Sequence, residues 1–143
     1  MQELQADVMQ ETRNTKVVQD AYAAFGKGDV ETLLGFFDEA IVWQPTVGAG
    51  SHVPQAGDRR GKASVGEFFK IVSESVDFLR FEPKEFVAQG DKVVALGHYT
   101  GKAPTGRSFD SDFVMVFTVR NGKVVQFQEF SDSAAINAAY DAA

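Results

Sequence analysis

The sequence predicts a single α+β domain, because helical patterns fill its first half and strand patterns its second half. With 143 residues, the chain can build one domain with a substantial core but is too short for two. Gly-Asp, Thr-Gly and Asn-Gly pairs divide residues 76–131 into strand-length runs, as hairpin turns do. The expected architecture is a set of helices packed on an antiparallel sheet.

Three helices are expected ahead of the sheet. Asn14 or Thr15 can cap the first, in which apolar residues recur at 3.6-residue spacing as far as Phe25. Asp29 can cap a second, short helix after a glycine-rich break, and Gly61 opens a third.

The first strand-like run begins at Ile41 and ends at Pro45, which cannot continue a sheet ladder. Residues 46–60 contain several glycines and are expected to form a loop. A short helix that Asp132 or Ser133 can cap follows the sheet. The later strands are expected at about residues 76–89, 92–103, 108–120 and 123–131.

The chain is expected to consist of a flexible N-terminal extension, residues 1–13, and one domain, residues 14–143. The extension is polar and has no apolar run that could act as a signal sequence. No stretch approaches the ~20 apolar residues that span a bilayer, and the net charge of −6 disfavours nucleic acid and anionic membranes. We therefore expect a soluble, cytoplasmic protein. The absence of cysteine excludes disulfides and thiolate sites.

Turn chemistry predicts how the last strands align. A three-residue turn at residues 120–122, with glycine in the left-handed conformation, places Met115 opposite Phe127 and Phe113 opposite Glu129. A two-residue Asn-Gly turn would set glutamines beside Met115 instead, so burial favours the first register.

The preceding hairpin is expected to turn at Thr105-Gly106, which places His98 opposite Phe113 and Leu96 opposite Met115. One face of the sheet then changes from apolar to polar along the strands. Such a gradient is typical of an apolar pocket with a few polar groups near its mouth rather than a closed core.

His98 and Glu129 are the candidate catalytic residues. In these registers both side chains face the pocket, about 10 Å apart across one intervening strand. Burial raises the pKa of a carboxyl and histidine titrates near neutrality, so the pair could act as acid and base. The alternative is a hydrogen-bonded structural histidine and a solvated glutamate. Asp112 is a rival functional carboxylate, although this register places it on the opposite face, beside Tyr99.

Large side chains from the helices and strands are expected to line the pocket and contact a small apolar molecule, with ordinary core packing as the alternative for each. The two histidines, His52 and His98, lack the spacing of a zinc site, so no metal is expected. No cofactor is expected either. The expected ligand contacts are Tyr22, Trp43, Phe68, Phe69, Leu96, Phe113, Met115 and Phe127.

Several segments in order carry a resemblance to a known family. They are AAFGKGDVETLLGFFDEAIVWQP, then Gly61 opening a helix with Phe68 and Phe69, then APTGRSF, then VRNGKVVQFQEFSDSAA. Together, from about residue 15 to residue 140, the chain resembles the SnoaL-like branch of the NTF2-like superfamily. That resemblance implies a cone-shaped, curved antiparallel (mixed) sheet with three N-terminal helices on its concave face, and a fold shared with ketosteroid isomerase and polyketide cyclases.

The same resemblance implies two classes of function, because one fold of this kind hosts many activities. One is an isomerase, lyase or hydrolase that acts on a small, largely apolar molecule of the polyketide-like kind, with His98 and Glu129 as acid/base groups. The other is a binding or interaction domain without turnover. The working residues of ketosteroid isomerase align with Ala21, Gln44, Phe69 and Met115, none of which can perform that chemistry. Steroid isomerisation by the known mechanism is therefore not expected.

A homodimer is expected through the face of the sheet that points away from the pocket. That face is expected to be largely apolar or β-branched, unlike an antiparallel face open to water, and the family resemblance implies sheet-to-sheet dimers. The alternative is that residues 1–13 fold back over this face in a monomer. Its expected members are Tyr99, Val114, Val116, Thr118, Val124 and Phe130, with Gln126 and Gln128 between them.

Overall fold

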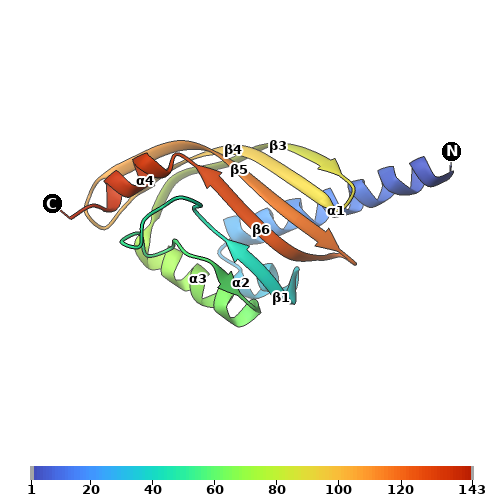
Figure 1. Cartoon of the computed structure of the whole chain (residues 1–143), viewed down its shortest axis with the longest axis horizontal. Helices are drawn as coiled ribbons and strands as arrows, with labels where there is room; N and C mark the ends of the chain where they lie inside the picture. The colour runs from blue at the N-terminus through green and yellow to red at the C-terminus, as the bar shows by residue number, and fades with distance from the viewer. Residues whose placement is uncertain (1, 143) are drawn as a thin grey trace.

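The computed structural model describes residues 2–142, in which four helices accompany one six-stranded sheet (Figure 1). The helices are α1 (Gln2–Gly26), α2 (Val30–Gly35), α3 (Lys62–Ser75) and α4 (Ser133–Tyr140). The strands are β1 (Phe37–Gln44), β2 (Arg59–Arg60), β3 (Asp77–Gln89), β4 (Lys92–Lys102), β5 (Ser108–Arg120) and β6 (Lys123–Ser131).

The strands are arranged in the order β2-β1-β6-β5-β4-β3, and only β1 and β6 pair in parallel. The sheet arches over α1, α2 and α3, which lie on its concave side, whereas α4 lies at one end (Figure 1). The predicted α+β architecture, a curved mixed sheet with helices on one face, is confirmed. We call the helix-covered side the inner face and the opposite side the outer face.

Local helix signals in the sequence correspond to the observed helix starts. Asp29 caps α2 by accepting a hydrogen bond from the Thr32 amide at 3.1 Å. Asp132 caps α4 in the same way, accepting from the Ala135 amide at 3.0 Å. Gly61 occupies the cap position of α3 with a φ of 89°, a conformation that favours glycine.

The expected start of the first helix, at Asn14 or Thr15, is wrong. Helix α1 begins at Gln2, and Asn14 lies inside it with its side chain 5% exposed. Residues 2–13 contain neither glycine nor proline and are rich in good helix formers, so nothing stops the helix from extending. Flexibility of residues 1–13 stays a prediction, and Met1 lies outside the described residues.

The hairpin between β5 and β6 differs from the prediction in its turn, whereas beyond the bulge its side chains lie on the predicted faces. Arg120 pairs with Lys123 across a two-residue turn in which Asn121 and Gly122 both have positive φ. A bulge before Val119 then shifts the pairing, so that later partners differ by two positions from the expected register. An even shift keeps each side chain on its face.

Glu129 therefore lies opposite Met115 instead of Phe113, while Phe117 pairs with Phe127 on the inner face. Because of the bulge, Val124 is fully buried and Val125 is not, which corrects the expected inward position of Val125.

The predicted register between β4 and β5 is wrong by one residue. The turn contains three residues, Pro104 to Gly106, closed by a hydrogen bond from the Ala103 amide to the Arg107 carbonyl at 2.9 Å. A one-residue slip reverses every side chain of the strand. Tyr99 therefore faces inward, and His98 faces outward opposite Asp112.

Steric complementarity explains why this register is preferred. Gly97 lies opposite Phe113, and a Cβ atom on Gly97 would stand 2.4 Å from the Phe113 ring. Gly101 and Phe109 repeat the arrangement, again with a clash at 2.4 Å. Each phenylalanine ring covers a glycine, which lets the two strands bend around the core without leaving a void.

Candidate functional site

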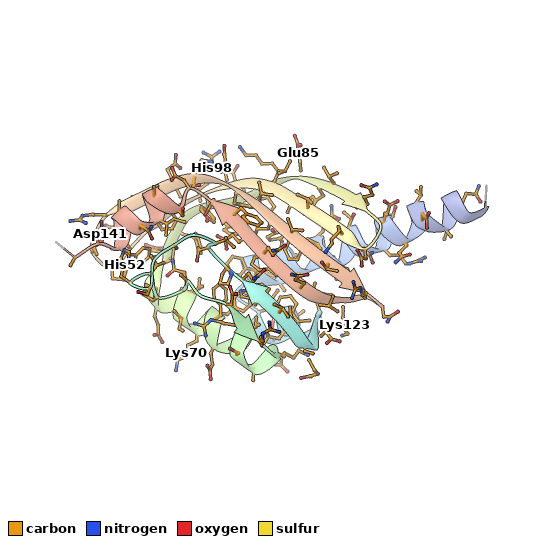
Figure 2. The ribbon with its side chains drawn as sticks, viewed as in Figure 1. His52, Lys70, Glu85, His98, Lys123 and Asp141 are labelled. Carbon is orange, nitrogen blue, oxygen red and sulfur yellow. The ribbon has the colours of Figure 1, made fainter. Side chains whose placement is uncertain are left out.

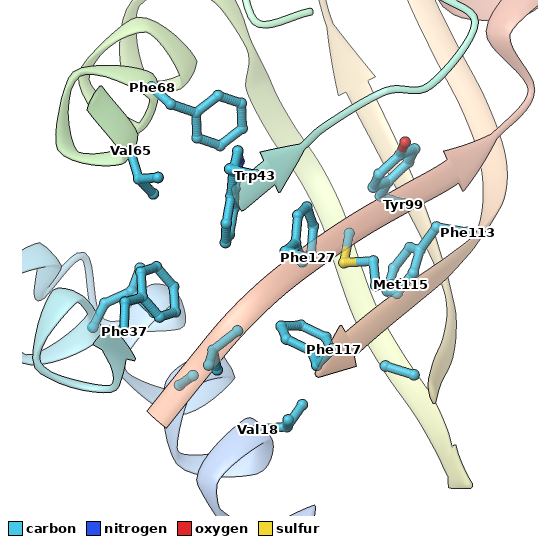
Figure 3. Packing of buried hydrophobic residues seen from close by; sticks show 14 of the residues in the cluster. Val18, Phe37, Trp43, Val65, Phe68, Tyr99, Phe113, Met115, Phe117 and Phe127 are labelled. Atoms are coloured by element: carbon cyan, nitrogen blue, oxygen red, sulfur yellow. The ribbon is translucent and has the colours of Figure 1, made fainter. Parts of the chain in front are cut away.

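A cavity of about 80 Å³ lies between the inner face of the sheet and helices α1 and α3. Aromatic rings make up most of its wall (Figure 3). Trp43 stacks on Phe127 with ring centroids 3.8 Å apart, and the rings of Phe68 and Phe69 each lie 5.5 Å from that of Trp43, centroid to centroid. An aromatic wall of this kind suits a flat, apolar molecule.

Six of the eight predicted ligand contacts line this cavity. They are Tyr22, Trp43, Phe68, Phe69, Met115 and Phe127. Of the two predicted catalytic residues, only Glu129 lines it. A role in binding or catalysis stays a prediction for each of these residues, but their convergence on one cavity agrees with the sequence pattern.

Glu129 is the only carboxyl among the described residues of the cavity wall. Its side chain accepts a hydrogen bond from the Tyr99 hydroxyl at 2.6 Å and another from the Thr46 backbone amide. The residue is 6% exposed. Burial raises the pKa of the Glu129 carboxyl above its ordinary value, and the two hydrogen bonds offset only part of that effect.

Two tyrosines accompany this carboxyl. Burial and the nearby Glu129 raise the pKa of Tyr99 well above the ordinary tyrosine value. The Tyr22 hydroxyl contacts the Met115 sulfur at 2.9 Å, and burial followed by the charge of Glu129 raises the pKa of Tyr22 as well. Both phenols therefore stay protonated and can donate hydrogen bonds.

The segment between β1 and β2 borders the cavity beside α4. It is held there because the Gly50 amide donates to Asn137 Oδ1 at 2.7 Å, and His52 contacts the Asp141 carboxylate at 2.9 Å (Figure 2). Thr46 and Gln55 from this segment contribute polar groups to the cavity wall.

His98 does not face the cavity, contrary to the predicted register. It lies on the outer face (Figure 2) between two aspartates, with Nδ1 at 2.8 Å from Asp112 and Nε2 at 2.6 Å from Asp110. Hydrogen bonds to Asp112 and Asp110 raise the pKa of His98. His98 and Glu129 therefore cannot act on one ligand as the expected acid/base pair.

Two predicted ligand contacts are corrected as well. Leu96 lies opposite Val114 on the outer face, because the predicted register between β4 and β5 is wrong by one residue. Phe113 faces inward and is 1% exposed, but it packs against Phe81 and Tyr99 in the core behind the cavity wall.

Sequence reasoning missed Tyr99, Thr46 and Gln55. The signal for Tyr99 was present, because Gly97 and Gly101 flank it at two-residue spacing and lie opposite phenylalanines. No comparable signal marks Thr46 or Gln55, which reach the cavity from a segment without regular structure.

Within residues 2–142, no cluster of three or more histidine, cysteine, aspartate or glutamate side chains is arranged to hold a metal ion. Over the same part of the chain, none of the helices has the length and apolar character needed to cross a membrane.

The sequence matches the SnoaL-like domain over residues 18–127. The chain belongs to the SnoaL-like family. Its structure is similar to an NTF2-like protein of Burkholderia xenovorans LB400, with 36% identity, a TM-score of 0.82, and 92% of this chain and 98% of that chain covered. No curated protein matches the sequence.

Two further solved structures are similar to this SnoaL-like chain. One is an NTF2-like protein of unknown function from Burkholderia pseudomallei K96243, with 28% identity, a TM-score of 0.82, and coverage of 91% and 98%. The other is TerC, co-crystallised with polyporic acid, with 26% identity, a TM-score of 0.78, and coverage of 91% and 99%.

Three of the four positions aligned with the working residues of ketosteroid isomerase lie at the cavity. Ala21, Phe69 and Met115 line the cavity, and none of them carries an ionisable group. Gln44 does not line it and instead donates a hydrogen bond to Asp58 at 3.3 Å. The carboxyl of this SnoaL-like cavity, Glu129, comes from a different position.

Proposed function

We propose that this SnoaL-like protein is an acid/base enzyme of the isomerase, lyase or hydrolase kind. Its substrate is a small, uncharged, largely apolar carbonyl compound held in the cavity. The proposal rests on the buried Glu129 carboxyl, hydrogen-bonded by Tyr99 inside an aromatic cavity. Burial raises the Glu129 pKa, and a raised carboxyl pKa suits a group that both takes up and returns a proton.

Tyr22 provides the second group that such a reaction needs. Its hydroxyl contacts the Met115 thioether, which is a weak acceptor, so the O–H can turn to a ligand's carbonyl oxygen. The nearby Glu129 charge contributes to the raised Tyr22 pKa, which keeps the phenol protonated as a donor. A phenol aimed at a developing oxyanion lowers the barrier to enolisation.

In the proposed step, ionised Glu129 removes the proton from the carbon next to the carbonyl group. The electron pair moves onto the carbonyl oxygen, which accepts a hydrogen bond from Tyr22. Glu129 then returns the proton to the same carbon or to a conjugated one. The step therefore needs no oxidant, reductant or second substrate.

The charge of the cavity supports an uncharged substrate. The described wall contains no lysine, arginine or histidine, so an anionic ligand would find no ion pair beside Glu129. A small-molecule ligand is also supported by the co-crystallisation of TerC with polyporic acid. A polyketide-like ring compound is one candidate of the proposed class.

Hydrogen–deuterium exchange tests this proposal. Cyclohex-3-en-1-one, a neutral single-ring ketone, is incubated in D2O, and exchange at the carbon between the carbonyl group and the double bond is followed by NMR. The wild type should accelerate exchange, and Glu129→Gln should reduce the acceleration at least about a hundredfold. His98→Gln is the matched control and should retain the full rate, because His98 lies on the outer face.

Binding is measured in parallel through the fluorescence of Trp43, the single tryptophan of the chain, which lines the cavity. Binding of the ketone without faster exchange would overturn the proposed enzyme and favour a ligand-binding domain. Exchange that survives Glu129→Gln unchanged would remove Glu129 from the mechanism.

A further inference from the structure

Three buried polar atoms of the cavity wall have no hydrogen-bond partner among the described residues. They are Trp43 Nε1, Thr46 Oγ1 and Gln55 Oε1. The three residues are 4%, 6% and 4% exposed, so solvent outside the fold does not satisfy them. Buried polar groups nearly always have partners, and one that lacks a partner destabilises the fold. Three of the six such atoms among the described residues belong to the wall of one cavity, where an occupant can supply the missing bonds.

Neighbouring contacts hold two of these groups in place. The Gln55 amide nitrogen donates to the Tyr140 hydroxyl at 3.0 Å, and that hydroxyl donates to the Ser75 carbonyl at 2.6 Å. Because the nitrogen is engaged, Gln55 Oε1 is the end of the amide left for a ligand. Thr46 has a φ of 42°, a conformation rare for a β-branched residue, while its backbone amide bonds Glu129.

The three atoms differ in what they require. The indole nitrogen of Trp43 only donates, the amide oxygen of Gln55 only accepts, and the Thr46 hydroxyl does both. A hydrocarbon satisfies none of them, and an ether or ketone oxygen cannot donate to Gln55. A carboxylate cannot donate either, and it would add a negative charge near Glu129. A hydroxyl group both donates and accepts.

We propose that Trp43, Thr46 and Gln55 form a hydroxyl-recognition subsite, so that the cavity's ligand is a neutral ring compound with an alcohol, phenol or enol group. This inference rests on the proposed function only in assuming that the cavity holds a small molecule. It does not depend on proton transfer by Glu129. Thr46 and Gln55 determine specificity in this view, whereas Glu129 carries the proton.

Three single-ring probes of similar shape test the subsite by isothermal titration calorimetry: p-cresol, p-xylene and p-toluate. A purely apolar cavity would favour p-xylene, because its methyl group costs less to remove from water than a hydroxyl group. The subsite predicts the reverse, with p-cresol bound about tenfold tighter than p-xylene. p-Toluate should not bind measurably.

Two variants test whether Gln55 and Thr46 recognise the hydroxyl group of p-cresol. Gln55→Leu and Thr46→Val should each reduce the preference for p-cresol to about threefold or less, without weakening p-xylene. Gln89→Leu is the matched control, because Gln89 is exposed at the end of β3, and it should keep the preference. Circular dichroism checks that each variant is folded, and the second variant serves if the first does not fold.

The outcomes separate the subsite from the proposed enzyme. If p-xylene binds as tightly as p-cresol, or if neither binds, the subsite is overturned, and a bound water molecule becomes the better partner for these atoms. Glu129→Gln should keep the preference for p-cresol while losing ketone exchange. Exchange without the preference would remove the subsite alone, and the preference without exchange would remove the proposed enzyme alone.

Discussion

The two faces of the sheet stabilise unusual protonation states by opposite means. On the inner face, Glu129 lies among aromatic rings with no cation among its contacts, and burial raises its pKa. On the outer face, His98 lies between Asp112 and Asp110, and these hydrogen-bonded carboxylates raise its pKa. Tyr99, the neighbour of His98 in the chain, belongs to the Glu129 site.

This contrast shows how the pKa of a group relates to its use. The Glu129 shift comes from dehydration, so the charged form is unfavourable and the proton can be exchanged with a ligand. The His98 shift comes from ion pairs near water, so it favours a fixed charge. The inner face therefore suits chemistry and the outer face suits contacts, which the following predictions test.

The largest expected effect concerns association through the outer face. The observed registers place Val94, Val114, Val116 and Phe130 there, with Val114 36% and Phe130 41% exposed. Tyr99 and Val124, which the sequence also placed there, are buried on the inner face. Light scattering should give the mass of a homodimer.

The substitution Val116→Glu should weaken this dimer at least about a hundredfold, because it would bury an unpaired charge. Gln89→Glu, an exposed change at the end of β3, is the control and should leave the mass unchanged. Helix α1 carries residues 2–13 beyond the sheet and not across its outer face (Figure 1), so it offers no cover for these valines. A wild-type mass of one chain would refute the dimer.

A smaller effect is expected in the dependence of stability on pH. The pKa of Glu129 is higher in the folded protein than in the unfolded chain. The contribution of Glu129 to stability is therefore fully present below the pKa of the unfolded chain, and it is lost as pH rises through the pKa of the folded protein. Between the two pKa values, the free energy of unfolding should fall by about 1.4 kcal/mol per pH unit.

Glu129→Gln carries no charge and should remove this slope. The difference in Tm between the variant and the wild type should therefore grow as pH rises above the ordinary glutamate range. Thermal unfolding followed by circular dichroism measures the difference. A constant difference across that range would mean that Glu129 is ionised in the fold at no cost, and the burial argument would be wrong.

The sequence was sufficient for the fold, for the starts of α2, α3 and α4 and for much of the cavity wall, because those features depend on local pattern. Asp29 and Asp132 cap helices because an aspartate side chain can accept a hydrogen bond from a backbone amide of the first turn. Trp43 and Phe127 face the cavity as the alternation of side chains along their strands predicts. Beyond the bulge, the predicted faces of β5 and β6 are also correct although the turn is not, since the pairing error there amounts to two residues. Next to the bulge, the predicted faces of Val124 and Val125 are wrong.

The β4–β5 alignment could not be decided from turn preferences alone. Two-residue and three-residue turns both fit Pro104 to Gly106, and the choice between them reverses His98 and Tyr99. Contacts between strands decide it, because only one register places Gly97 beneath the Phe113 ring. Pairing of glycines with phenylalanines across strands is therefore a better guide than the turn in this sheet.

The smallest expected effect belongs to His98 and tests the outer face directly. NMR titration should give His98 a pKa above the ordinary value of about 6.5. Asp112→Asn should lower that pKa most, and Asp110→Asn should also lower it, because the two carboxylates favour the charged ring. The facing strand β3 carries Glu82, already paired with Arg80, so this pair adds little.

The contribution of His98 to stability changes with pH in the same direction as that of Glu129, because both pKa values are raised in the fold. The causes differ, since carboxylates raise the pKa of His98 and burial raises that of Glu129. A raised histidine pKa contributes stability that is fully present below the unfolded value near 6.5 and is lost as pH rises through the folded pKa. The effect on stability should be slight, because the Asp110 and Asp112 side chains are 68% and 92% exposed and solvent screens them. His98→Gln should therefore unfold at nearly the wild-type temperature above this range and slightly lower below it. A pKa of His98 that is unchanged by Asp112→Asn would show that the ion pair does not persist in solution, leaving the outer face as an apolar surface with an unpaired histidine.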